Sequence, residues 1–108
     1  SNNPAVRAAV LDRKEAQSMA WARSRKDAGR GFGFTGGHYH WNWGNSDFRT
    51  LVLNAIAWTA HANVPESGVP SRDLKVADLL ANQDFDVPTD FNPARIQAML
   101  DEWAAARK

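Results

Sequence analysis

Cysteine is absent from the 108 residues of this sequence, which excludes a disulfide, a thiolate metal ligand and a cysteine nucleophile within it. The absence of cysteine does not indicate in which cellular compartment the protein resides. Long apolar runs are also missing, and a membrane-spanning helix needs about 20 consecutive apolar residues, so no membrane partner is expected. The sequence also lacks an excess of either charge, because 13 Lys and Arg balance 12 Asp and Glu to a net charge of +1. Without a basic stripe, no nucleic-acid partner is expected either.

Tryptophan, in contrast, is abundant, with five copies in the chain. Three of them, Trp41, Trp43 and Trp58, fall within a short stretch of the sequence. One interpretation is a hydrophobic core beneath a rigid loop. The other is a surface that stacks on a flat ligand, because aromatic rings serve both purposes.

Two short segments are predicted to form the strands of a β-hairpin. Residues 18–24 and 30–35 are rich in aromatic and small residues, and side chains alternate between the faces of a strand. Between them lies the polar turn 26–29, in which Gly29 is available for a positive φ. We expect one buried cluster between this hairpin and a following helix, made of Trp21, Phe32, Phe34, Leu51, Leu53, Ile56 and Trp58.

Helices are predicted on both sides of the hairpin. Asn3 followed by Pro4 is typical of a helix start, and we expect a short helix there that buries Val6 and Val10. Asn45 or Ser46 is expected to cap a long helix that continues to about residue 58, because its apolar residues recur every three or four positions.

The last third of the chain is predicted to be a linker followed by two helices. Residues 64–71 are rich in Pro and Gly and lack periodicity. A short helix is expected over residues 74–81. A final helix is expected after Asn92 and Pro93, which repeat the Asn-Pro start signal.

The loop 36–44 after the second predicted strand holds the candidate site. His38 and His40 are the candidate catalytic residues, because imidazole titrates near neutral pH and suits acid or base chemistry. If the loop is extended, its alternating aromatic residues project to one side, where they stack on a sugar while amides bond its hydroxyls. The candidate substrate-binding residues are Tyr39, Trp41, Asn42, Trp43 and Arg30.

Simpler interpretations of these residues stay open. His38 is equally explained as a histidine that hydrogen-bonds the loop, and a single Trp more often fills a core than binds a ligand. His38 and His40 lie two apart and would share a metal if Asp47 or His61 added a third ligand, but a bare His-x-His pattern is weak. We therefore expect no metal and no cofactor.

The segment around the loop resembles the closing part of trehalose-utilisation (ThuA-like) domains. The similarity covers roughly residues 3–71. Its motifs are the glycine-arginine strand Gly29-Arg30-Gly31-Phe32-Gly33-Phe34-Thr35, the turn Gly36-Gly37-His38, the run Trp41-Asn42-Trp43-Gly44, and the helix Phe48-Arg49 to Ile56-Ala57-Trp58.

The resemblance implies an α/β fold with a flavodoxin-like sheet, related to class I glutamine amidotransferases. In those relatives a late His-x-Glu completes a catalytic triad. Here His38 matches the Gly-His turn, and Asn42 stands where the Glu is expected if His40 is aligned instead. Glutamine amidotransferase activity is therefore not expected. The implied ligand is a small-molecule sugar, a disaccharide such as trehalose or its keto derivative.

The expected organisation is a C-terminal portion of a ThuA-like domain over residues 1–71 and a helical extension over 72–108. The chain begins without methionine, so we expect an N-terminal half of the domain upstream. That half, or a self-association surface, is the expected macromolecular partner. Two functions stay open, a hydrolase or lyase acting on a sugar, and a catalytically silent module that binds sugar or serves as structure.

Overall fold

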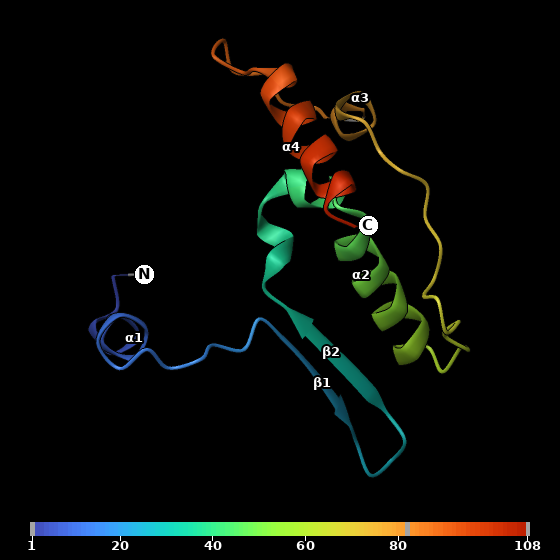
Figure 1. Ribbon diagram of the computed structural model, residues 1–108. Helices are drawn as coiled ribbons and strands as arrows, with labels where there is room; N and C mark the ends of the chain where they lie inside the picture. The colour runs from blue at the N-terminus through green and yellow to red at the C-terminus, as the bar shows by residue number, and fades with distance from the viewer. Residues whose placement is uncertain (1, 82, 108) are drawn as a thin grey trace.

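The computed structural model describes residues 2–81 and 83–107, which form a small mixed α/β arrangement (Figure 1). The described elements follow in chain order: α1 Pro4–Arg7, the π-helical turn η1 Ala8–Asp12, β1 Ala20–Ser24, β2 Arg30–Phe34, the 3-10 turns η2 Gly36–His38 and η3 His40–Gly44, α2 Ser46–Thr59, α3 Val76–Leu80 and α4 Pro93–Ala105. No helix in this described part has the length and apolarity to cross a membrane.

The hairpin forms as predicted, with β1 and β2 paired antiparallel. Its register sets Ala22 opposite Phe32, and Trp21 opposite Gly33. Because neighbouring side chains point to opposite faces, Trp21 lies on the other side of the sheet from Phe32 and Phe34. Its indole lies across Gly33, where any added Cβ would overlap the ring. Trp21 therefore cannot join a cluster with the two phenylalanines, and it is 55% exposed.

The turn between the strands takes its positive φ at Ala28, at 66°, and not at Gly29 as predicted. The Arg25 N–H donates to the Gly29 carbonyl at 2.7 Å, so Gly29 already belongs to the paired backbone. The left-handed position is the last of the three loop residues, as in hairpins with a type I turn followed by a bulge. A residue with a Cβ is held there at a cost of about 1 kcal/mol.

The predicted cluster between the hairpin and α2 is not buried. Ile56 is 58% exposed and Leu51 38%, while Phe32, Phe34, Leu53 and Trp58 are only partly covered. The apolar residues of α2 extend around most of the helix, and a hairpin of two strands covers only one side of it (Figure 1). The expectation of burial was therefore wrong.

The best-buried apolar group lies instead where α3 and α4 pack against η3. Val76, Leu79 and Leu100 are each at most 6% exposed. Partly buried side chains surround them: Trp41, Trp43, Leu74, Leu80, Phe91, Ile96, Met99 and Trp103. This core joins the loop at 36–44 to the tail after residue 72.

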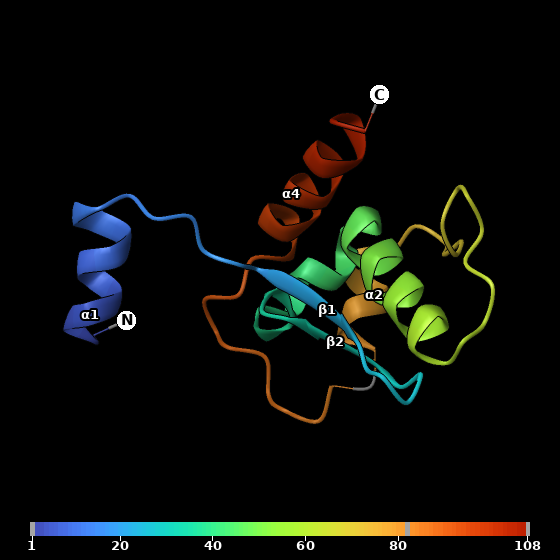
Figure 2. The same cartoon turned by 90° about the horizontal axis from the view of Figure 1, so that it is seen from below.

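The N-terminal helix begins where predicted but buries nothing. The Asn3 side chain accepts the Ala5 N–H at 2.9 Å, which caps α1 as expected of this residue type. Val6 and Val10 are nevertheless exposed. Figures 1 and 2 show α1 standing away from the other elements, so no neighbour covers its apolar side. The predicted burial of these valines is wrong for that reason.

Both ends of α2 are closed by local hydrogen bonds. Asn45 is the cap, and its Oδ1 accepts the Asp47 and Phe48 N–H groups at 2.9 and 3.0 Å. At the other end His61 has a φ of 59°. The Ala62 N–H reaches the Ala57 carbonyl at 2.9 Å and closes the helix.

Candidate functional site

The loop 36–44 is helical and not extended, because it forms the two short turns η2 and η3. Only Tyr39, between the turns, has an extended backbone, with φ −88° and ψ 111°. In a 3-10 turn the side chains point outward in three directions, so the aromatic residues do not share one side. Trp43 packs edge-on against Phe48 at 4.9 Å and contacts the core.

Tyr39 and Trp41 do come together, in a cavity that we call the aromatic hollow. Its volume is about 550 Å³. Tyr39 is exposed and Trp41 partly buried, and the rest of the lining comes from the segment that leads into α4 and from α4 itself. The lining residues are Tyr39, Trp41, Pro88, Asp90, Phe91, Asn92, Arg95, Ile96 and Met99.

One wall of the aromatic hollow is a stacked pair of rings. Trp41 and Phe91 lie 5.3 Å apart between centroids with an interplanar angle of 20°. This contact joins η3 to the segment before α4, two parts of the chain that are fifty positions apart. The stack therefore sets both the position of Trp41 and the width of the hollow.

Two opposite charges in the aromatic hollow are available to a ligand. Among residues 2–81 and 83–107, neither the Asp90 carboxylate nor the Arg95 guanidinium has a hydrogen-bond or ion-pair partner. Asn92 is committed, because its Oδ1 accepts the Arg95 N–H at 3.2 Å and caps α4. The hollow thus offers a carboxylate that accepts, a guanidinium that donates, and aromatic faces.

The two histidines occupy different environments. His38 ends η2, is exposed, and has no hydrogen-bond partner in the described part of the chain. It is not part of the lining of the aromatic hollow. His40 is partly buried, and its Nε2 lies 2.8 Å from the Leu79 carbonyl oxygen. A carbonyl only accepts, so Nε2 carries the proton and Nδ1 is the nitrogen left for other partners.

Asn42 and Arg30 bind the backbone, away from the aromatic hollow. The Asn42 amide donates to the Gly36 carbonyl at 2.9 Å and bridges the two turns. Arg30 donates to the Trp58 carbonyl at 2.8 Å, and its guanidinium carbon lies 5.0 Å from the centre of the Trp58 ring. A cation at a helix C-terminus and over an indole face is favourable on both counts.

The residues considered for a metal do not converge. Asp47 pairs with Arg107 at 3.0 Å, and the backbone of His61 closes α2. No group of three or more His, Asp or Glu side chains in the described residues is arranged to hold a metal ion. Within the described residues, no third side chain joins His38 and His40 to complete a metal site.

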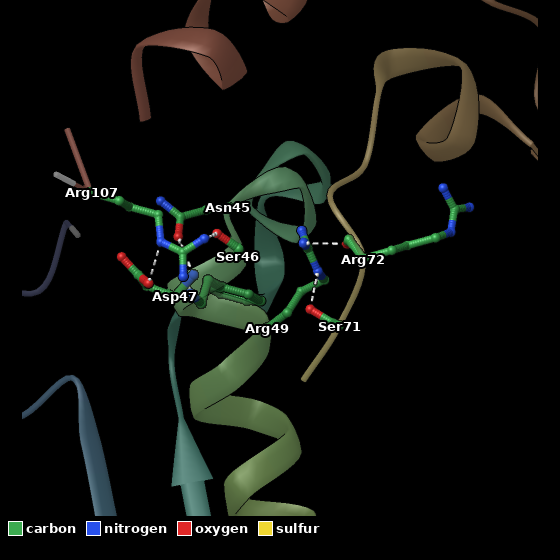
Figure 3. A network of polar contacts seen from close by, with 8 residues as sticks. Asn45, Ser46, Asp47, Arg49, Ser71, Arg72 and Arg107 are labelled. Carbon is green, nitrogen blue, oxygen red and sulfur yellow. Dashed lines mark hydrogen bonds and ion pairs between the residues drawn. The ribbon is translucent and has the colours of Figure 1, made fainter. Parts of the chain in front are cut away.

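A buried arginine holds η3 in place through hydrogen bonds (Figure 3). Arg49 is 7% exposed and donates to three acceptors: the Trp43 carbonyl at 2.7 Å, the Ser71 hydroxyl at 3.1 Å and the Arg72 carbonyl at 2.8 Å. Burial lowers the pKa of its guanidinium. These bonds join η3, α2 and the segment before α3.

A second polar contact links the ends of two helices. Arg107, just beyond α4, donates to the Ser46 hydroxyl and pairs with Asp47 in the first turn of α2 (Figure 3). Nearby, Leu100 of α4 packs directly on Gly44, where an added Cβ would overlap its side chain. Together these contacts hold α4, and with it Arg95, against η3.

Sequence reasoning missed Asp90, Phe91 and Arg95, because they lie in the tail that we predicted to be a separate extension. A signal was present in the run Asp90-Phe91-Asn92, where a charged and an aromatic residue directly precede a helix cap. No match to the chain was found among protein-family models, curated proteins or solved structures. Function is therefore inferred from the chemistry of the aromatic hollow.

Proposed function

We propose that this protein binds a disaccharide, such as trehalose or its keto derivative, in the aromatic hollow. The observation that carries the proposal is the presence around one cavity of Tyr39, Trp41, Asp90 and Arg95, the last two without a side-chain partner among the described residues. Small-molecule sites combine apolar and aromatic walls with a few convergent polar groups. A volume of about 550 Å³ lies within the range of such sites.

The chemistry of a sugar matches these groups one by one. The C–H face of a pyranose packs on an aromatic ring, and Tyr39 and Trp41 supply such faces. The Asp90 carboxylate accepts hydrogen bonds from hydroxyl groups, and the Arg95 guanidinium donates to hydroxyl or keto oxygens. Hydrogen bonds to charged groups are the stronger ones, so this pair would orient the ligand.

Binding without catalysis is favoured over a hydrolase or lyase role. His40 has one ring nitrogen committed to Leu79, and Asn42 provides no carboxylate beside it. His38 is free for acid or base chemistry, and it carries the catalytic alternative. If the full-length protein turns over a sugar, His38→Ala should abolish that activity and leave the protein folded, whereas unchanged turnover removes His38 from the mechanism.

We also propose that the fold is a ThuA-like, flavodoxin-like domain, and that another polypeptide segment covers the exposed side of the hairpin and α2. Support comes from the order of β2, a Gly-His turn and an asparagine-capped helix. Exposed Trp21 and Ile56 support the second part. The covering segment would be the rest of that α/β domain or a second copy of the chain.

Calorimetric titration of the full-length protein with trehalose and with 3-keto-trehalose tests the proposed function. Arg95→Ala should weaken binding about tenfold, which corresponds to ~1.4 kcal/mol. Arg7→Ala is the matched control, because Arg7 is an exposed arginine of α1 outside the hollow. Absence of binding, or equal losses in both variants, would contradict the proposal.

A further inference from the structure

A second cavity shares part of its lining with the aromatic hollow. We call it the side hollow, and its volume is about 180 Å³. Trp41, Pro88 and Phe91 line both cavities. The two cavities are therefore neighbours that have part of their wall in common.

The side hollow differs from its neighbour in chemistry. Its own lining includes Leu80, Phe85 and Val87, and the shared wall adds two aromatic rings and a proline. Asp86 and Gln83 also border it and are exposed. Apolar cavities of about 150 Å³ accept a benzene ring, so a hollow of this size suits one small apolar group.

Phe85 borders the side hollow and is largely uncovered. Its side chain is 83% exposed, the highest value among the exposed large hydrophobic residues. A phenylalanine held in water lacks the stabilisation that burial of its apolar surface would give. An apolar ligand group in the side hollow would cover part of this ring.

We propose that the ligand is a glycoside with an apolar aglycone, whose sugar ring occupies the aromatic hollow while the aglycone occupies the side hollow. This inference rests on the proposed sugar binding and adds the ligand class. The polar groups Asp90 and Arg95 line the aromatic hollow, and the apolar residues Leu80, Phe85 and Val87 line the side hollow. His40 borders the side hollow with its Nε2 already bonded, so only its Nδ1 is available there.

The test compares methyl α-D-glucopyranoside with phenyl α-D-glucopyranoside in titrations of the full-length protein. Both carry the same sugar, and only the phenyl group fills the side hollow. The phenyl glycoside should bind about tenfold more tightly, because its ring is removed from water. Phe85→Ser should remove most of this preference and leave binding of the methyl glycoside unchanged.

Leu11→Ser is the matched control, because Leu11 is an exposed apolar residue of η1, away from the side of the hairpin and α2 proposed to be covered, and it lines neither cavity. It should leave the preference intact. If the methyl glycoside binds and the phenyl glycoside binds no better, the aglycone inference is wrong while sugar binding stands. A preference that survives Phe85→Ser, or that Leu11→Ser reduces, overturns it as well. Failure of both glycosides to bind overturns the aglycone inference, while the trehalose titration decides the proposed function separately.

Discussion

Polar side chains in this protein divide into those that hold the backbone and those that remain available to a ligand. Arg30, Asn42 and Arg49 all donate to main-chain carbonyl groups. Groups used in this way stabilise the fold and have little left to offer a substrate. Asp90 and Arg95 are without such partners in the described part of the chain. The aromatic hollow is therefore the candidate ligand site because its polar side chains are available to a ligand, more than because of their residue types.

The ionisation of the Asp78 carboxyl group makes the stability of the fold depend on pH. Its carboxylate accepts from Arg72 at 2.7 Å and from the Lys75 N–H at 2.8 Å, which lowers its pKa from 3.8 to about 2. Because the folded pKa is lower than the unfolded one, the stabilisation is complete above about pH 4 and is lost as the pH falls toward 2.

Asp78→Asn should therefore lower the urea midpoint of the full-length protein at pH 6. The difference from the unsubstituted protein should shrink as the pH falls to about 2. Asp84→Asn changes an exposed carboxylate without an ion-pair partner in the described residues, and should leave the midpoint unchanged. An effect of Asp78→Asn that is the same at both pH values would contradict this role.

At the scale of elements, the closest contact that supports the site is the packing of α4 on η3. Leu100 is 5% exposed and lies directly over Gly44. Gly44→Ala should destabilise the protein by about 2 kcal/mol, since overfilling a packed contact costs on the order of 1–3 kcal/mol. It should also weaken sugar binding, because Arg95 is carried on α4.

Gly37→Ala is the control for this substitution. Gly37 lies on the neighbouring turn, and nothing stands within 4 Å of the position that a Cβ would take. Thermal unfolding of both variants measures the difference. Equal destabilisation by the two substitutions would show that the packing of Leu100 on Gly44 is not responsible.

Helix starts could be predicted from the sequence because their causes are local. Asn3, Asn45 and Asn92 each accept backbone N–H groups within the next three residues. The hairpin was predictable for the same reason, as its two strands and their turn are adjacent in the chain. Even there, the sequence did not predict that Ala28, and not Gly29, takes the left-handed conformation, because this depends on the register of the loop.

Burial and the site depended on contacts that local patterns do not encode. The apolar spacing of α2 identified a helix but did not identify which elements cover it. Of the predicted site residues, only Tyr39 and Trp41 line the aromatic hollow. Their partners on the tail could not be predicted from local patterns, because the stack of Trp41 and Phe91 joins residues that are fifty positions apart in the chain.

The whole molecule is more open than a self-contained domain of its length. Its radius of gyration is 17.4 Å, whereas a compact domain of this size has about 13 Å. The described sheet has two strands, so each strand has one edge without a strand partner. Such edges and exposed apolar side chains are typical of surfaces that another chain segment covers.

The isolated 108-residue chain should therefore self-associate or unfold without cooperativity. Light scattering after size-exclusion chromatography measures its mass, and a thermal melt measures its cooperativity. Trp21→Lys, on the exposed side of the hairpin, should reduce the association. A monodisperse monomer with a sharp two-state transition would contradict this expectation, and the chain would then be a small domain in its own right.

Sugar binding in the aromatic hollow is tested most directly by the tryptophan indole N–H signals in an NMR titration of the full-length protein with trehalose. Trp41→Phe identifies the Trp41 signal by its loss. The signal of Trp41 should shift saturably with trehalose, while those of Trp58 and Trp21, which lie outside the hollow, should stay in place. Unmoved signals at saturating trehalose, or shifts confined to Trp58 or Trp21, would contradict the assignment of the site.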